Sequence, residues 1–195
     1  MFKNLRVATK LGIGFAVVVM LALLQAGYSW ESLHDLSTDI TLLAEDRMVK
    51  VDQLSAIKDN ANVVARAVRN MVLLKEPADI LGEKKRIDDA LARNGELIKT
   101  LEGTLRSAES RAALKDIEDT FVPYGASIAH VVELAKADKD EEATAVLLKN
   151  VRPLQAAHFK ALDAAADLQR KLASQLGVQA RADAGTAVLL LALLS

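Results

Sequence analysis

Apolar residues recur at alternating intervals of three and four along four long stretches between residues 31 and 183, and short polar breaks separate these stretches. Such spacing places the apolar side chains along one face of a helix. Four such helices with short connections bury their apolar faces by packing as an up-down-up-down antiparallel bundle. The pattern therefore predicts an all-α fold, with an antiparallel four-helix bundle over residues 31–183.

The same spacing names the residues that we expect in the core of the bundle. The first stripe runs through Leu33, Leu36, Ile40, Leu43, Val51, Leu54, Ile57, Ala61, Val64, Val68 and Met71. The second runs through Ile87, Leu91, Asn94, Ile98, Leu101 and Leu105, and the third through Leu114, Ile117, Phe121, Tyr124, Ile128, Val131 and Ala135. The fourth runs through Leu154, His158, Ala161, Ala165, Leu168, Leu172 and Leu176.

Local signals predict where these helices begin and end. Pro77 pushes the residue before it out of the helical region, so the first helix should end at Lys75-Glu76-Pro77. The second helix should stop near Ser107, and Ser110 is a candidate N-cap for the third. Asp138 stands three residues before Glu141, which is the spacing of a capping box at the next helix start.

Two prolines fall inside the apolar pattern. The pattern of the third helix continues through Pro123, which favours a kink over an end. Pro153 leaves two alternatives, a first-turn position after a helix break at Asn150 or a kink within a longer helix.

Both ends of the sequence have the character of membrane segments. Residues 11–30 carry no charge over a length that matches a bilayer core, and Lys3, Arg6 and Lys10 precede them, so residues 1–10 are predicted to be a cytoplasmic leader. Residues 31–183 would then lie in the periplasm. Residues 184–195 are apolar but too few to span, and we interpret them as the truncated start of a second span. The alternative for the first segment is a cleaved signal peptide.

Composition narrows the classes of function. The net charge of −1 offers no overall basic field for nucleic acid. The absence of cysteine excludes disulfides and thiolate metal sites. His34, His130 and His158 lie far apart in the sequence, and neither an HExxH motif nor a glycine-rich phosphate loop occurs. We therefore expect neither enzyme activity, nor a cofactor, nor a metal site.

Three segments resemble the N-terminal part of bacterial methyl-accepting chemotaxis proteins. MFKNLRVATKLGIGF at 1–15 is similar to their basic leader and first span, and EDRMVKVDQLSAIKDNANVVARAVRNMVL at 45–73 to their first sensory helix. NVRPLQAAHFKALDAAADLQ at 150–169 resembles the start of their last helix. The resemblance implies a ligand-binding four-helix bundle that dimerises through the first helix. It also implies a ligand held between subunits near the membrane-distal end, and a piston-like shift of the last helix as the signal.

Candidate ligand-binding residues lie on the first helix. Asn62, Arg66 and Arg69 share one stripe with Leu73, offset from the core stripe. Two guanidinium groups on one face suit a carboxylate, because each offers a planar fork of donors. By resemblance, Arg69 matches a ligand-binding arginine of the aspartate receptor, but another such arginine is replaced here, so aspartate specificity does not carry over. The alternative is that both arginines form a solvated face or pair with acids.

The other candidates come from the third and fourth helices. Arg152, beside Pro153, stands where a helix break would free backbone groups for a ligand, and Gln155 and His158 follow it. Tyr124 belongs to the core stripe of the third helix and has a hydroxyl that would reach a pocket. For Tyr124 and His158 the alternative is ordinary core packing with a satisfied polar tip.

These observations favour a chemoreceptor sensory domain in the bacterial inner membrane. We expect it to bind a small organic anion, such as a tricarboxylic acid cycle intermediate or an aromatic acid. The resemblance implies a homodimer that acts on a chemotaxis kinase and coupling protein through the missing C-terminal region. Two alternatives stay open: the sensory domain of a histidine kinase or cyclic-dinucleotide enzyme, and a membrane-anchored adaptor bundle without a small ligand.

Overall fold

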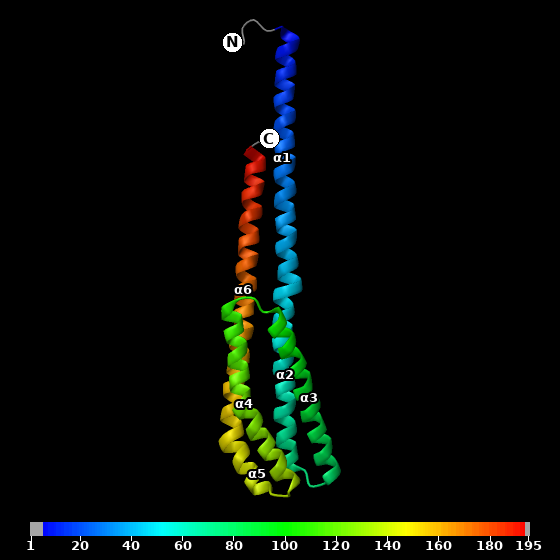
Figure 1. Ribbon diagram of the computed structural model, residues 1–195, viewed down its shortest axis with the longest axis vertical. Helices are drawn as coiled ribbons and strands as arrows, with labels where there is room; N and C mark the ends of the chain where they lie inside the picture. The colour runs from blue at the N-terminus through cyan, green and yellow to red at the C-terminus, as the bar shows by residue number, and fades with distance from the viewer. Residues whose placement is uncertain (1–5, 194–195) are drawn as a thin grey trace. The chain divides into compact units, whose positions relative to one another are not determined.

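The computed structural model describes residues 6–193, with the side chains of all but Lys10 and Leu193. Lys3 of the predicted leader and the last two residues of the predicted second span lie outside this range. The described chain is helical and contains no strand (Figure 1). Its elements are α1 (Val7–Thr41), η2 (Leu42–Arg47), α2 (Met48–Leu73), α3 (Pro77–Thr104), α4 (Ala108–Lys136), α5 (Asp140–Val146), η3 (Leu147–Val151) and α6 (Arg152–Leu193). Because α1, η2 and α2 follow each other directly, as do α5, η3 and α6, residues 6–193 form four helices, and the predicted all-α four-helix bundle is confirmed.

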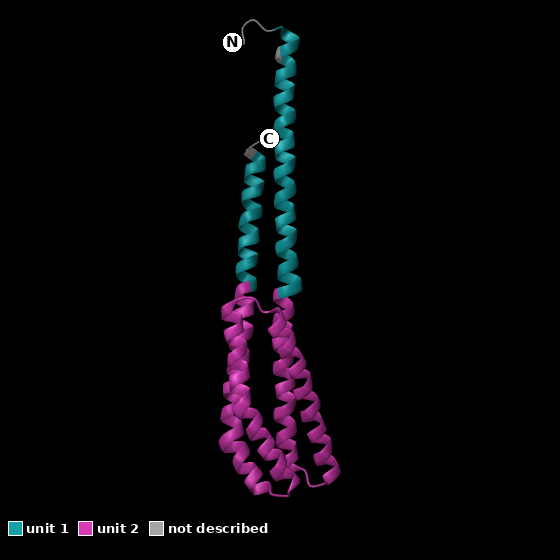
Figure 2. Ribbon diagram, in the orientation of Figure 1, with its two compact units in different colours: residues 1–46, 173–195 teal, residues 47–172 magenta. Residues whose placement is uncertain are grey.

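The chain divides into two compact units (Figure 2). Residues 47–172 form the bundle, and residues 1–46 with 173–195 form a second unit of two helical segments side by side. In this second unit the Gln25 amide donates a hydrogen bond to the Leu191 carbonyl at 2.9 Å. Ala180 and Ala187 are buried there, because small side chains let two helices approach closely.

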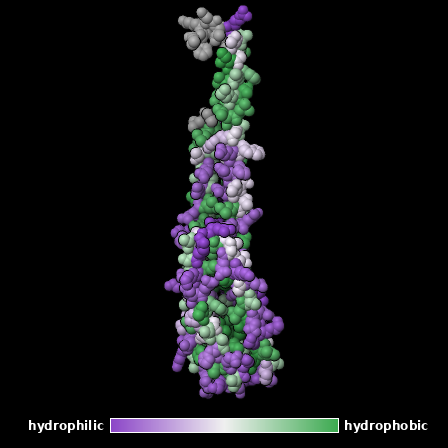
Figure 3. All heavy atoms as spheres, viewed as in Figure 1, coloured by the Kyte–Doolittle hydropathy of each residue, from purple (hydrophilic) through white to green (hydrophobic). Residues whose placement is uncertain are grey.

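The first helical run contains a stretch that is long and apolar enough to cross a membrane. Its most apolar window has a mean hydropathy of 2.3, and none of that window is buried inside the protein. Figure 3 shows the apolar surface of the N-terminal part of α1. This property agrees with the span predicted at residues 11–30, while its orientation stays a prediction.

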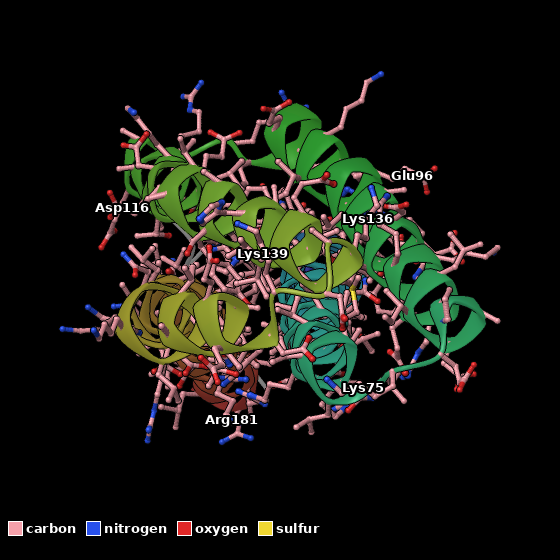
Figure 4. The ribbon with its side chains drawn as sticks, turned by 90° about the horizontal axis from the view of Figure 1, so that it is seen from below. Lys75, Glu96, Asp116, Lys136, Lys139 and Arg181 are labelled. Atoms are coloured by element: carbon pink, nitrogen blue, oxygen red, sulfur yellow. The ribbon has the colours of Figure 1, made fainter. Side chains whose placement is uncertain are left out.

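The core of the bundle consists of two clusters of buried side chains. One joins Leu54 and Ile57 of α2 to Leu101, Ile117 and residues of α6, and the other is centred on Val64, Val68, Met71, Tyr124 and Val131. Nearly all of these residues belong to the predicted stripes. Figure 4 shows the labelled Glu96 and Asp116 pointing away from the centre of the bundle.

The predicted core was wrong at the start of its first stripe. Leu33 is 65% exposed and Ile40 is 56% exposed, because both belong to the two-helix unit and lie outside the four-helix bundle. The stripe holds from Val51 onward. Leu162 of α6 is 1% exposed, although it lies one position off the predicted fourth stripe.

The N-cap of α4 is Ser107, and the prediction of Ser110 was wrong. The Ser107 hydroxyl accepts a hydrogen bond from the Ser110 backbone N–H at 3.1 Å, so the cap lies three residues earlier. Ser110 is itself buried and its hydroxyl accepts a hydrogen bond from Gln169 of α6 at 2.9 Å. Ser110, which was expected to cap α4, therefore connects α4 with α6 instead.

The predicted capping box at Asp138 and Glu141 was also wrong. Asp138 has a φ of 56°, and the Asp138 and Lys139 backbone N–H groups donate to the carbonyls of Ala135 and Leu134. This pattern is a Schellman motif that ends α4, in which Asp138 takes the left-handed position that favours glycine or asparagine. The next helix has no side-chain cap, and Lys139 precedes its first residue.

The two prolines behave differently. The α4 helix continues through Pro123, as predicted. At Pro153 the alternative of a break at Asn150 was wrong, because the chain is helical without interruption from Asp140. The five residues before Arg152 form a π-helix instead, and the Arg152 N–H donates to the Leu147 carbonyl. A proline has no N–H for this ladder, and a π-turn is one way in which a helix accommodates the loss.

Candidate functional site: a hollow between α2 and the π-turn

A hollow of about 320 Å³ lies within the bundle, between the C-terminal part of α2 and the junction of η3 with α6. Its six lining residues come from these elements only: Arg69, Leu147, Leu148, Val151, Arg152 and Gln155. Its volume falls in the range that accommodates small organic ligands. Three of the seven predicted ligand-binding residues thus meet at one place.

The polar part of this hollow carries positive charge without a carboxylate. The Arg69 guanidinium donates a hydrogen bond to the Gln155 side-chain oxygen at 3.2 Å, and Arg152 lies on the same helix as Gln155. Lysines elsewhere in the bundle pair with acids: Lys75 with Asp140, Lys136 with Glu133 and Lys139 with Glu142. No acidic residue lines this hollow, so two guanidinium groups are available to a ligand. Arg69 and Arg152 are both exposed, which leaves their donors accessible.

Tyr124 lies in the core of the bundle, close enough to Arg69 for the charge of Arg69 to act on it. It is 1% exposed, and its hydroxyl has no hydrogen-bond partner among the described residues. Burial raises the pKa of Tyr124 to about 12, and the positive charge of nearby Arg69 opposes this shift. The residue is not one of those that line the hollow. Its core position was therefore predicted correctly, and its hydroxyl is a buried donor without an acceptor.

His158 does not line this hollow, and the structure places it in the core. It is 2% exposed, and its Nδ1 atom lies 3.2 Å from the Thr120 hydroxyl. Its ring centroid lies 5.5 Å from that of Phe121 and 5.6 Å from that of Tyr124. Burial lowers the pKa of His158, and the Ile117 backbone opposes the shift, so the imidazole is neutral at pH 7. Core packing, the alternative reading of this histidine, agrees with these observations.

Asn62 and Arg66 share a face of α2 with Arg69, as the spacing predicted. Arg66 is exposed and Asn62 is half-buried, but neither lines the hollow. Leu73, on the same face, is 76% exposed. A role for Asn62 and Arg66 in ligand binding stays a prediction.

Sequence reasoning missed the apolar wall of the hollow, which consists of Leu147, Leu148 and Val151. These residues form most of the π-turn η3, where the wide turn changes which side chains face α2. The sequence offers one signal for it. Leu147, Leu148 and Val151 precede Pro153 without an intervening glycine, which indicates a helix that continues with an irregular turn.

The chemistry of the hollow is that of binding. Two guanidinium groups and an amide suit a carboxylate, and the leucines and Val151 suit a short carbon skeleton. Among the described residues, no group of three or more histidine or acidic side chains is placed to hold a metal ion.

Comparison with known proteins identifies one family. The sequence profile of a four-helix-bundle sensory module for signal transduction matches residues 4–184. A search of curated proteins finds no match.

Proposed function

The chain belongs to the family of four-helix-bundle sensory modules for signal transduction, and we propose that it senses a small organic anion directly, through the hollow at Arg69. One observation carries this proposal: Arg69 and Arg152, from two different helices, line the same hollow with Gln155, and no acid neutralises them there. A carboxylate ligand supplies the missing charge, and bidentate contacts with guanidinium groups fix its orientation.

Tyr124 adds a second reason to place an anion near Arg69. A buried hydroxyl without a partner costs free energy in the empty protein. Because Tyr124 does not line the hollow, a water molecule between the ligand and its hydroxyl would accept the hydrogen bond that Tyr124 cannot make within the described chain. Di- or tricarboxylates of central metabolism and aromatic acids combine carboxylate oxygens with a carbon skeleton that fits the apolar wall of Leu147, Leu148 and Val151.

The route of the signal follows from the elements that bear the site. Gln155 and Arg152 belong to α6, which continues without a break to Leu193. A ligand that draws Arg69 of α2 toward α6 changes the relative position of these two helices by a small axial shift. We propose that the module lies in the periplasm, that α1 anchors it in the inner membrane, and that the shift acts on a cytoplasmic kinase-control module.

A homodimer through α2 is part of the same proposal. Leu73 and Leu148 are both strongly exposed, at 76% and 56%, and Leu148 lines the hollow. Exposed apolar side chains beside a binding site are typical of surfaces that a second subunit covers. Arg66, on the same face of α2, would then contact a ligand bound between two copies.

The test is a thermal-shift screen of the full chain in detergent micelles with succinate, malate, citrate and benzoate. At a ligand concentration about 100 times the dissociation constant, the folded state gains about 2.7 kcal/mol. For a chain of this size, each kcal/mol raises the unfolding temperature by about 2 to 4 °C. We expect such a shift with at least one acid, and we expect Arg69→Ala and Arg152→Ala to abolish it.

Two matched variants sharpen this test. Arg86→Ala removes an exposed arginine of α3 that pairs with Glu83 and does not line the hollow, so it should leave the shift unchanged. Arg66→Ala separates a site within one subunit from a site between subunits, because only the second arrangement uses Arg66. A shift that survives in Arg69→Ala would refute the placement of the site, and the absence of any shift across the acids would favour the adaptor alternative.

A further inference from the structure

A second hollow of about 390 Å³ lies between α3 and α4, and its chemistry differs from that of the hollow at Arg69. Its wall is mainly apolar, with side chains from both helices and from α2, namely Ile57, Leu91, Ile98, Ile117, Phe121 and Val122. Val122 is 71% exposed, so an apolar side chain stands at the mouth. The hollow exists because α3 packs chiefly along α2 and only lightly against α4.

Two glycines shape the space. Gly95 lines the hollow from α3, and a Cβ atom added there would meet no atom within 4 Å. At Gly125 of α4, an added Cβ would lie 3.2 Å from the ring of Phe121, so the absence of a side chain lets this ring fold back along its own helix. A side chain at Gly95 would fill the hollow, and one at Gly125 would displace the Phe121 ring that lines it.

One wall of the hollow is held firmly. The Asn60 amide donates to the Asn94 side-chain oxygen at 2.9 Å, and the Asn94 amide donates to the Ile57 carbonyl at 3.2 Å. These two bonds fix α3 against α2, and Asn94 lines the hollow. A preformed wall lowers the conformational cost of binding a ligand.

The charged group at this hollow is an acid. Glu118 of α4 lines it, and burial together with the charge and hydrogen bond of Glu102 raises the pKa of Glu118. Glu102 belongs to α3, so two carboxyl groups approach each other across the gap between the helices. His158 also lines the hollow, and its buried imidazole supplies a neutral polar group. Two neighbouring carboxylates repel each other unless a proton or a cation lies between them, and an organic ammonium ion can take that place.

We propose that the hollow between α3 and α4 binds a small organic ammonium ion, whose apolar body packs on Phe121 and Ile98 and whose charged group pairs with Glu118 and Glu102. The aromatic ring of Phe121 suits such a ligand, because its face attracts a cation and its surface packs on apolar groups. This site is independent of the proposed anion site, since Arg69, Arg152 and Gln155 do not line it.

The experiment measures binding of 2-phenylethylammonium to the full chain in detergent micelles by isothermal titration calorimetry. Its neutral analogue 2-phenylethanol and its anionic analogue phenylacetate serve as matched ligands. We expect saturable binding of the ammonium ion, and about tenfold weaker binding of the alcohol, because a hydrogen bond between charged groups is lost. Saturable binding that is equally tight for the alcohol, or no saturable binding of the ammonium ion, would overturn the proposal.

Two glycine variants locate the site. Gly95→Leu fills the hollow and should abolish binding, whereas Gly103→Leu, on the same helix but outside the lining, should retain it. Both replacements favour helix formation, so both variants should fold. Equal binding by the two variants would contradict the placement between α3 and α4, whether the ligand bound elsewhere on the protein or only to the micelle.

Two charge variants complete the test. Glu118→Gln should weaken binding of the ammonium ion by about tenfold and leave binding of the alcohol unchanged. Arg69→Ala should leave binding of the ammonium ion unchanged, even though it removes the thermal shift with carboxylates. The proposal for the anion site and the proposal for the ammonium site therefore fail or succeed separately.

Discussion

The ring of Tyr124 lies against the imidazole of His158, with 5.6 Å between the ring centroids and 31° between the ring planes. The charge of Arg69 acts on Tyr124, whereas His158 lines the hollow between α3 and α4. This ring pair therefore lies between the hollow lined by Arg69 and Arg152 and the hollow lined by Glu118. Both rings are buried, and each has a polar atom whose environment makes a measurable prediction.

Tyr124→Phe separates stability from ligand binding. The substitution removes a buried hydroxyl that has no partner, so we expect the free energy of unfolding to rise by about 1 kcal/mol. If the hydroxyl donates to a water molecule beside a bound anion, the same change weakens carboxylate binding by about fivefold or more. Unfolding of the full chain and titration with the acid found in the screen measure the two effects. A variant that is destabilised by more than a few tenths of a kcal/mol would show that the hydroxyl has a partner in the folded protein.

His158 should make the bundle sensitive to acid. Its folded-state pKa is lowered by burial, so below pH 6.5 the unfolded chain binds a proton that the folded chain does not. Stability is therefore fully present above pH 6.5, and it falls as the pH drops from 6.5 toward the lowered pKa of the folded state. Thermal unfolding at pH 7.5 and pH 5.5 measures the loss.

Variants assign this acid sensitivity to one histidine. His158→Gln cannot take up the proton and should show a smaller loss of stability between pH 7.5 and pH 5.5 than the parent protein. His130→Gln replaces an exposed histidine of α4 and should behave as the parent does. Glu118 titrates in both proteins, so its contribution cancels in the comparison. Identical pH dependence of the parent and His158→Gln would contradict the assignment.

Ser107 should stabilise the start of α4. Because its hydroxyl accepts from the Ser110 N–H, Ser107→Ala should lower the free energy of unfolding by about 1 kcal/mol. Ser107→Asp keeps an acceptor at the cap and adds a favourable charge at the helix N-terminus, so it should retain most of the stability. Chemical unfolding of the two variants measures the difference, and equal stability would mean that the cap contributes nothing.

Much of the bundle was predictable, because burial follows the helical period. Val64, Val68 and Met71 are buried where spacing alone placed them, and Tyr124 lies in the core as its stripe required. Leu33 and Ile40 have the same spacing and are nevertheless exposed. Periodicity identifies a face of a helix, but it does not say whether another helix covers that face.

The errors at helix ends have different causes. Ser107 and Ser110 are the same residue type three positions apart; Ser107 caps α4, while the Ser110 hydroxyl accepts a hydrogen bond from Gln169 of α6. At Asp138 the left-handed backbone ends one helix, where the sequence offered an equally good pattern for starting the next. At Ser110 a contact distant in sequence accompanies the choice, whereas at Asp138 the backbone hydrogen bonds to Ala135 and Leu134 close the end of α4 locally.

The candidate site was predictable in its charges but not in its boundaries. Arg69, Arg152 and Gln155 were expected from helical spacing and from resemblance, and they line one hollow. His158 was expected beside them, but because the helix continues through Pro153, its side chain points into the core of the bundle. The hollow between α3 and α4 depends on Gly95 and on the light packing of two helices, which a single sequence does not reveal.

The π-turn at Leu147–Val151 also determines the direction in which the side chains of α6 point around the helix axis. A π-turn holds one residue more than the α-helical turn that it replaces, and each residue of an α-helix rotates the chain by about 100°. Deletion of Asn150 would restore a regular turn and rotate Gln155 and His158 together around the axis of α6. A single-residue insertion thus acts as an angular offset, which keeps Gln155 beside Arg69 while His158 faces the interior.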